Sequence, residues 1–214
     1  RESLFLQTKF TYQRGQDHRL PYDPKDSFTK QVQASFASSL SNLHTDYIDS
    51  FLLHGPNSAM GLDDCDFETW AAIEGLYQTG QVKMIGISNV GIGQLEELFS
   101  KSTVKPMVVQ NRCYAERGWD KPVREFCAKN KIIYQGFSLL TANGFIFSNS
   151  RFLEIARRHA VTPQQLVFRF ARDIQILPIT GTTKEEHMKH DLRSFDFELS
   201  QAEIETIHML SFDR

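Results

Sequence analysis

Short apolar runs that alternate with helical patterns constrain the fold of this chain more than any other feature. About six times along its 214 residues, a run long enough for one buried strand is followed by apolar residues at helical spacing. The stretch 46–56 shows the design, because its apolar run ends at His54 and a Gly-Pro pair stops the strand. Such alternation predicts a parallel sheet, either closed into a barrel or doubly wound.

Capping residues and breakers set the boundaries of these segments. Ser27 is suited to cap the first helix, Pro163 to occupy the first turn of a later helix, and Ser200 to cap the last. The predicted strands are 4–9, 46–54, 82–87, 107–109, 132–136 and 174–178, and the predicted helices are 28–42, 67–77, 92–100, 121–129, 151–159, 163–171, 184–192 and 201–210. No linker-like change of composition interrupts them, so we expect one domain over 1–214.

Composition narrows the class of protein. The chain is 41% hydrophobic and 23% charged, with a net charge of −2 and no basic block, which argues against nucleic acid and membrane surfaces as partners. No apolar run approaches the roughly 18 residues of a membrane span. Three cysteines at unrelated spacings argue against a disulfide framework and favour a reducing, cytoplasmic setting.

Polar residues follow nearly every predicted strand. In a (β/α) barrel the active site is built at the carboxyl ends of several strands at once. One polar strand end is equally well explained by simple capping, and a lone histidine there by a bond to a neighbouring carbonyl. A set that includes a lysine and a histidine predicts a site. The set comprises Lys9, His54, Ser88, Asn89, Gln110, Asn111, Ser138 and Thr180.

Several of these segments resemble the aldo-keto reductases. The stretch 6–10 is similar to the family's catalytic-lysine strand, 46–56 to its catalytic-histidine strand, and 80–89 to its G-K-x-x-x-I-G-x-S-N pattern. Further matches, which extend the resemblance over essentially the whole chain, are 108–111, 137–138, 178–183 and 195–199. The resemblance implies a (β/α)8 barrel of the TIM type and NADP(H)-dependent reduction of aldehydes or ketones to alcohols by hydride transfer.

The resemblance also implies roles for individual residues. The catalytic set would be Lys9 and His54. His54 would orient the substrate carbonyl, and Lys9 would lower the pKa of a tyrosine acid. Ser88, Asn89 and Gln110 would hold the nicotinamide carboxamide, for which strand-end capping is the alternative.

A second group of residues would bind the rest of the cofactor. Phe137 stands where the family has an aromatic ring stacked on the nicotinamide, and a core phenylalanine is the alternative. The stretch 180–184 meets a helix start and suits a phosphate, or simply caps the helix. His187, at the position for the 2′-phosphate, and Asp191, near the adenine, leave the preference for NADP over NAD open. The set is Phe137, Ser138, Thr180, Gly181, Thr182, Thr183, Lys184, His187 and Asp191.

The resemblance begins at the third of the family's eight strand–helix units. The family's catalytic tyrosine and aspartate precede its lysine strand, and Tyr12 and Tyr22, which follow Lys9, do not match the tyrosine position. We therefore expect an N-terminally truncated barrel with about six of eight units. The explanations, in order of preference, are a fragment of a longer reductase, a natural short form with impaired catalysis, and two copies that complete each other.

Three functions stay open on the sequence. The first is an aldo-keto reductase, monomeric or weakly homo-oligomeric, that acts on a small carbonyl compound with NADP(H). The second is a catalytically incomplete relative that binds cofactor or a partner protein as a regulatory subunit. The third is Schiff-base chemistry at Lys9, which the histidine and the Ser-Asn pair speak against. A metal site at His187, His190 and Asp191 is disfavoured, because a solvated helix face explains these residues more simply.

Overall fold

The computed structural model describes residues 1–210, so the last four residues of the predicted 1–214 domain lie outside the described range. The chain forms two compact units, of which the first is Arg1–Gln110 and the second begins at Asn111. None of the helices within residues 1–210 is both long and apolar enough to cross a membrane.

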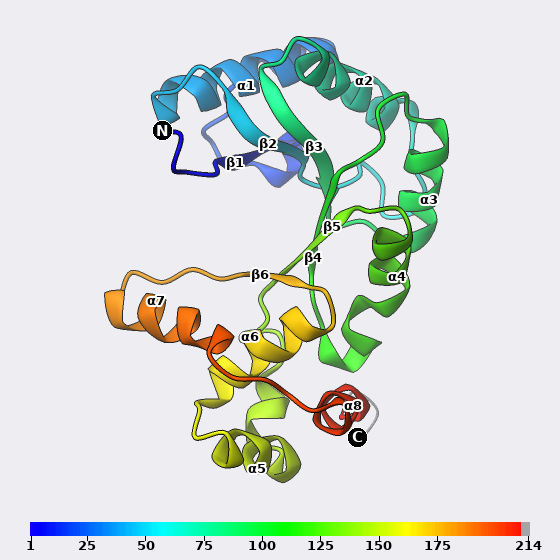
Figure 1. Ribbon diagram of the computed structural model, residues 1–214. Coiled ribbons are helices and arrows are strands. Elements are labelled where there is room, and N and C mark those ends of the chain that lie inside the picture. The colour runs from blue at the N-terminus through cyan, green and yellow to red at the C-terminus, as the bar shows by residue number, and fades with distance from the viewer. Residues whose placement is uncertain (211–214) are drawn as a thin grey trace. The chain divides into compact units, whose positions relative to one another are not determined.

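Parallel strands alternate with helices along the described chain, which confirms the predicted α/β fold (Figure 1). The strands are β1 (Gln7–Phe10), β2 (Ile48–Leu53), β3 (Val82–Ser88), β4 (Val108–Arg112), β5 (Ile133–Phe137) and β6 (Leu177–Ile179). The helices are α1 (Phe28–Leu43), α2 (Asp64–Gln78), α3 (Ile92–Lys101), α4 (Lys121–Lys129), α5 (Ser150–Arg158), α6 (Pro163–Asp173), α7 (Glu185–Leu192) and α8 (Gln201–Met209), with 3-10 helices η1 (Gln13–Gly15), η2 (Ala115–Asp120), η3 (Gly144–Ser148) and η4 (Arg193–Phe195). Among residues 1–210, β1 pairs only with β2 and β6 only with β5, so the strands do not close into a barrel.

Parallel register fixes the sheet of the first unit. Lys9 of β1 lies opposite Leu52 of β2, Leu52 lies opposite Gly86 of β3, and Gly86 lies opposite Val108 of β4. A Cβ atom on Gly86 would lie 2.1 Å from the carbonyl oxygen of Val108, so only glycine lets β3 and β4 approach this closely. Because the strands are parallel, their carboxyl ends meet at one edge.

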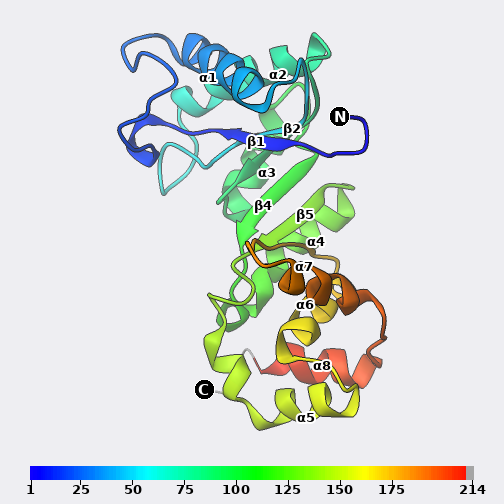
Figure 2. The same cartoon turned by 90° about the vertical axis from the view of Figure 1, so that its left-hand side faces the viewer.

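Helices α1 and α2 pack on each other and on these strands (Figures 1 and 2). Ser27 caps α1 by accepting a backbone N–H, as predicted, and Asp63 forms a reciprocal capping box with Asp66 at the start of α2. Phe36 of α1 packs edge-to-face on Phe51 of β2, with ring centroids 5.3 Å apart. Large side chains that this unit buries almost completely are Phe10, Ile48, Phe51, Leu52, Trp70, Ile73, Ile85 and Ile87.

The second unit is mainly helical. Helices α5, α6 and α8 pack on one another, and α6 also packs on β6. Thr162 and Ser200 begin α6 and α8 with capping boxes, and Pro163 occupies the first turn of α6, as predicted. The core includes Trp119 of η2, whose ring centroid lies 4.9 Å from that of Phe170. Helix α7 differs from the others because it buries none of its residues.

The first and the last strand each begin three residues later than predicted. The first begins at Gln7, where pairing with β2 begins, and Leu4 and Phe5 before it are each 59% exposed. The last begins at Leu177, where pairing with β5 begins, after a left-handed residue at Gln175. In both cases the apolar run is longer than the segment that finds a strand partner.

Candidate active site

The first unit brings polar residues from four strand ends to one edge. His54 follows β2 directly, and its backbone N–H donates to the Phe10 carbonyl oxygen at 2.8 Å, one residue beyond Lys9. Ser88 ends β3 and lies opposite Gln110 of β4. The predicted site residues that share this edge are Lys9, His54, Ser88, Asn89 and Gln110.

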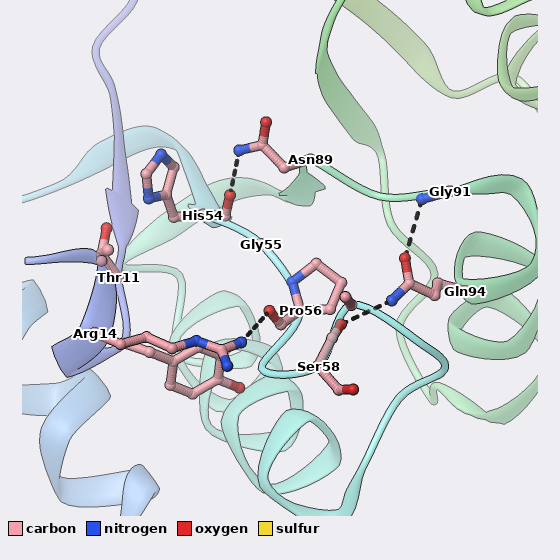
Figure 3. Close-up of a pocket in the computed structure, with 12 residues that line it drawn as sticks. Thr11, Arg14, His54, Gly55, Pro56, Ser58, Asn89, Gly91 and Gln94 are labelled. Carbon is pink, nitrogen blue, oxygen red and sulfur yellow. Dashed lines mark hydrogen bonds between the residues drawn. The ribbon is translucent and has the colours of Figure 1, made fainter.

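A cavity of about 640 Å³ opens at this edge, with His54 and Asn89 on its wall (Figure 3). The rest of the lining comes from segments that follow β1, β2 and β3, and it includes Tyr12 and Arg14. None of the lining residues is acidic. The volume is ordinary for a site that binds a small organic molecule.

Lys9 and His54 are electrostatically linked. Burial lowers the pKa of Lys9. Burial, and after it the positive charge of Lys9, lowers the pKa of His54, so the imidazole is neutral at pH 7 and has one N–H to donate. Within residues 1–210 neither the Lys9 ammonium nor the His54 ring takes part in a hydrogen bond or ion pair. Both groups are therefore open to a ligand.

Asn89 is held in a left-handed backbone conformation, with φ at 52°. Its Nδ2 donates to the His54 carbonyl oxygen at 2.7 Å (Figure 3), and its backbone N–H donates to the Gln110 carbonyl oxygen at 3.1 Å. The amide oxygen Oδ1 has no hydrogen-bond donor among residues 1–210. Asn89 thus joins the ends of β2, β3 and β4 and keeps one acceptor for a ligand.

Ser88 supports Asn89 from inside the protein. Its side chain is fully buried, its hydroxyl donates to the Gln110 carbonyl oxygen at 2.5 Å, and its Oγ accepts from Asn89 Nδ2 at 3.2 Å. The single O–H of Ser88 is therefore already used. The geometry suits a residue that positions Asn89 better than one that touches a ligand.

Tyr12 belongs to a loop, as expected, but it is only 7% exposed and lies on the cavity wall. Its hydroxyl donates to Asp66 Oδ1 at 2.9 Å, and that oxygen also accepts from the Asn57 backbone N–H at 2.7 Å. Burial raises the pKa of Tyr12 and also that of Asp66. Asp66 ties the segment after β1 to the segment after His54. No local signal in the sequence could have revealed this link, because Asp66 is 54 residues from Tyr12.

In the second unit most of the remaining predicted residues lie on the walls of two of its cavities. The predicted residues on the wall of the first, of about 400 Å³, are Thr180, Gly181, Thr182, His187 and Asp191. The second, of about 390 Å³, brings Ser138 together with Thr180 and Gly181. Phe137, Thr183 and Lys184 lie on neither wall.

The start of α7 carries charges of both signs. Thr182 Oγ1 accepts from the Lys184 backbone N–H at 3.1 Å and lies 3.4 Å from His187 Nδ1. Glu185 and Glu186 occupy the first turn, and all of these residues except Thr182 are exposed. An anion at this helix start would meet the positive helix end, an imidazole and an ammonium group, but also two carboxylates.

Asp191 and Phe137, the last two predicted site residues, have different surroundings. Burial raises the pKa of Asp191, and the neighbouring His187 and His190 oppose that rise. No group of three or more His, Cys, Asp or Glu residues within 1–210 is arranged to hold a metal ion. Phe137 is half-buried, and its ring centroid lies 5.6 Å from the guanidinium carbon of Arg112.

Known proteins share this sequence pattern. The sequence model of the aldo/keto reductase family matches residues 1–211. Glyoxal reductase of Bacillus subtilis is 33% identical over 189 residues, which cover 88% of this chain and 66% of that enzyme. The NAD/NADP-dependent indole-3-acetaldehyde reductase of Schizosaccharomyces pombe is 34% identical over 185 residues, which cover 84% of this chain and 64% of that enzyme. The chain thus spans less than two thirds of the length of these relatives.

A solved structure agrees with these matches. MGS-M4, an aldo-keto reductase from a Medee basin deep-sea metagenome library, superposes with a TM-score of 0.83 and 27% identity over 98% of this chain and 72% of that chain. The six parallel strands and their helices therefore match the barrel fold of aldo-keto reductases, although they are not closed here. Sequence and fold lead to the same conclusion: the chain belongs to the aldo/keto reductase family.

Proposed function

We propose that this chain is an NADP(H)-dependent oxidoreductase that reduces the carbonyl group of a small aldehyde or ketone to an alcohol. One observation carries the proposal. The Lys9 ammonium and the His54 ring have no hydrogen-bond or ion-pair partner among residues 1–210. The two residues lie at neighbouring strand ends, and His54 lines an open cavity. Family membership and the name of the indole-3-acetaldehyde reductase, which includes NAD/NADP dependence, support it.

The nicotinamide end of the cofactor fits the donors and acceptors of the first unit. A carboxamide needs both a donor and an acceptor from the protein, and Asn89 Oδ1 is an acceptor without a partner among residues 1–210. Ser88 would act by holding Asn89, and Gln110 would contribute from the neighbouring strand end. The bound cofactor would supply the hydride that is added to the carbonyl carbon.

The residues of this chain would prepare the carbonyl group for that addition. The neutral His54 ring would donate its N–H to the carbonyl oxygen and fix the orientation of the substrate. The ammonium group of Lys9 would stabilise the negative charge that develops on the same oxygen. Because the pKa of Lys9 is lowered by burial, it is also a better proton donor than an exposed lysine.

The phosphate end of the cofactor would use the second unit. Thr180, Thr182 and His187 offer hydroxyl groups and an imidazole on one cavity wall, and Lys184 offers a charge next to it. Asp191 on the same wall would repel a phosphate. We therefore infer a weak preference for NADP over NAD. We propose Phe137, Ser138, Gly181 and Thr183 as further cofactor-binding residues of the second unit.

One observation favours a second function, a cofactor-binding or partner-binding protein without turnover. Among residues 1–210, Tyr12 is the only tyrosine on the wall of the His54 cavity, and its hydroxyl donates to Asp66. Burial raises the pKa of Tyr12, which makes it a poor proton donor to a substrate. If Lys9 does not supply the proton, cofactor binding without reduction follows.

The test is NADPH binding, followed by fluorescence, together with NADPH oxidation in the presence of 4-nitrobenzaldehyde. We expect His54→Ala and Lys9→Met each to lower kcat/KM about 100-fold or more while NADPH binding is kept. His18→Ala and Lys25→Met are matched controls, because both residues are exposed and lie outside the cavity lining. Binding without oxidation would establish the second function, and absence of NADPH binding would overturn both.

A further inference from the structure

Arg14 occupies an unusual position for an arginine. It lies on the cavity wall with His54, and its Nη2 donates to the Pro56 carbonyl oxygen at 3.1 Å (Figure 3). That bond uses one of the five N–H groups of the guanidinium. Within residues 1–210 Arg14 forms no ion pair and donates to no other side chain. An arginine with four unused donors at a cavity wall is suited to bind an anion.

The backbone holds Arg14 at this place. The turn of η1 is closed by a bond from the Gly15 N–H to the Tyr12 carbonyl oxygen at 2.9 Å. A Cβ atom on Gly15 would lie 2.9 Å from Thr11 Cγ2, so the turn fits tightly on the chain before it. Tyr22 donates to the Thr11 carbonyl oxygen at 2.6 Å and secures the same segment from the other side. Little ordering is therefore left for a ligand to impose.

The charges around the cavity favour an anion. Among residues 1–210 no acidic residue lines the wall, and Arg14 is the one permanently charged residue there. Asp17, three residues after Arg14, pairs with Arg19 at 2.5 Å, and Asp66 accepts from Tyr12 of the cavity wall. A cavity with positive charge and no acid attracts carboxylates and raises their local concentration.

Arg14 is close enough to His54 for one small molecule to reach both. Its hydrogen-bond acceptor belongs to Pro56, two residues after His54, and two residues span at most about 7 Å of chain. Because both residues line one cavity, a molecule with a carbonyl group at one end and an anionic group at the other, separated by one aromatic ring or a chain of a few atoms, would present one group to each.

We propose that Arg14 makes this cavity selective for carbonyl compounds that carry a carboxylate. The proposal rests on the proposed carbonyl reduction and names its substrate class. The planar guanidinium would form a bidentate pair with the carboxylate, while His54 holds the carbonyl oxygen at the other end of the molecule. Arg14 is a specificity-determining residue in this scheme and takes no part in the chemical step.

The test compares 4-carboxybenzaldehyde with its methyl ester, which has the same ring and aldehyde but no charge. We expect the wild type to have the lower KM for the acid. Arg14→Gln, which removes the positive charge, should raise KM for the acid about tenfold at low salt, with kcat and the KM for the ester unchanged. Arg14→Lys should restore part of the preference, since it restores the charge without the fork. The matched control is Lys25→Gln, in the same loop but exposed and outside the cavity lining, which should change neither KM.

A second measurement separates failure of this proposal from failure of the reductase function. Calorimetry with terephthalate, a dicarboxylate of the same length, reports binding at Arg14 without turnover. Binding by the wild type that Arg14→Gln weakens about tenfold supports the anion site even if neither aldehyde is reduced, and only the reductase function then fails. Equal effects of Arg14→Gln on acid and ester, or unchanged terephthalate binding, would overturn the role of Arg14.

Discussion

In the first unit, His54 and Asn89 follow buried strands, and hydrogen bonds to main-chain carbonyl oxygens of neighbouring segments fix both residues. In the second unit, Thr182 and His187 lie on a turn and on a helix that buries none of its residues. Burial and these hydrogen bonds restrain the strand-end residues of the first unit. The exposed turn and helix of the second unit have fewer contacts that would resist a shift.

This difference matches the demands of the two kinds of binding. Hydride addition needs the carbonyl group in one orientation, and a small displacement is costly. A phosphate is bound through charge and several interchangeable donors, so its partners tolerate movement. The proposed orienting residues lie on the rigid unit and the proposed phosphate-binding residues on the more adaptable segment.

The largest expected effect compares the packing of the strands in the first unit with that of β5 in the second. Gly86→Ala would place a Cβ atom 2.1 Å from the main-chain oxygen of Val108, so β3 and β4 would have to separate. Gly136→Ala in β5 would meet side-chain atoms alone, of which the nearest is Ile176 Cγ2 at 2.6 Å. We expect losses in the free energy of unfolding of about 3–5 kcal/mol and about 1–2 kcal/mol, respectively, from urea denaturation.

Gly75→Ala is the control for this pair, because nothing lies within 4 Å of the added Cβ atom on helix α2. There the substitution should stabilise the chain by about 0.5–1 kcal/mol. Equal losses of unfolding free energy for Gly86→Ala and Gly136→Ala would contradict the claim that the strands of the first unit are the less deformable.

A smaller effect is expected at Asp49, at the start of β2. Burial disfavours its charge, but a bond from the Leu6 N–H and ion pairs with Arg1 and Lys83 outweigh that cost, and its pKa falls to about 2. Because the folded pKa is below the unfolded value, the stabilisation is complete above about pH 4 and is lost as the pH falls toward 2. Asp49→Asn should cost about 1–2 kcal/mol of unfolding free energy at pH 7.

The pH dependence of this cost separates the charge from the hydrogen bonds. Wild type and Asp49→Asn should converge in unfolding free energy between pH 4 and 2. A difference that persists unchanged to pH 2 would show that the carboxylate charge is not what ties β2 to the chain start.

The smallest expected effect concerns the start of α7. Glu186 lies in the first turn, where it opposes an anion, so Glu186→Gln should tighten NADPH binding about two- to fivefold at low salt. Glu205→Gln, on the exposed side of α8, is the matched control and should leave the dissociation constant unchanged. Weaker NADPH binding in Glu186→Gln would place the phosphate elsewhere.

Sequence patterns predicted the features that depend on residues nearby along the chain, such as the starts of helices. Ser27, Thr162 and Ser200 act on N–H groups three residues away, so the helices they begin could be placed closely. Strand β1 could not be placed as well, because its start depends on pairing with Ser50 of β2 rather than on the apolar run at Leu4.

In the candidate site, too, some residues could be predicted from the sequence and others could not. Strand ends and a family resemblance predicted that Lys9 and His54 belong together, and the parallel register brings them to one edge. The place of Arg14 and the burial of Tyr12 depend on contacts with Pro56 and Asp66, which lie 42 and 54 residues further along the chain. Only the folded arrangement brings such groups together.

The left-handed backbone of Asn89 narrows the amino acids that this position can accept. Glycine, asparagine and aspartate adopt such a conformation readily, whereas other side chains are strained there. Glycine has no amide to donate to the His54 carbonyl oxygen, and a carboxylate of aspartate would repel that oxygen. The backbone thus favours these three residues, and the hydrogen bond favours asparagine among them. At this single position the fold and the binding chemistry select the same amino acid for independent reasons.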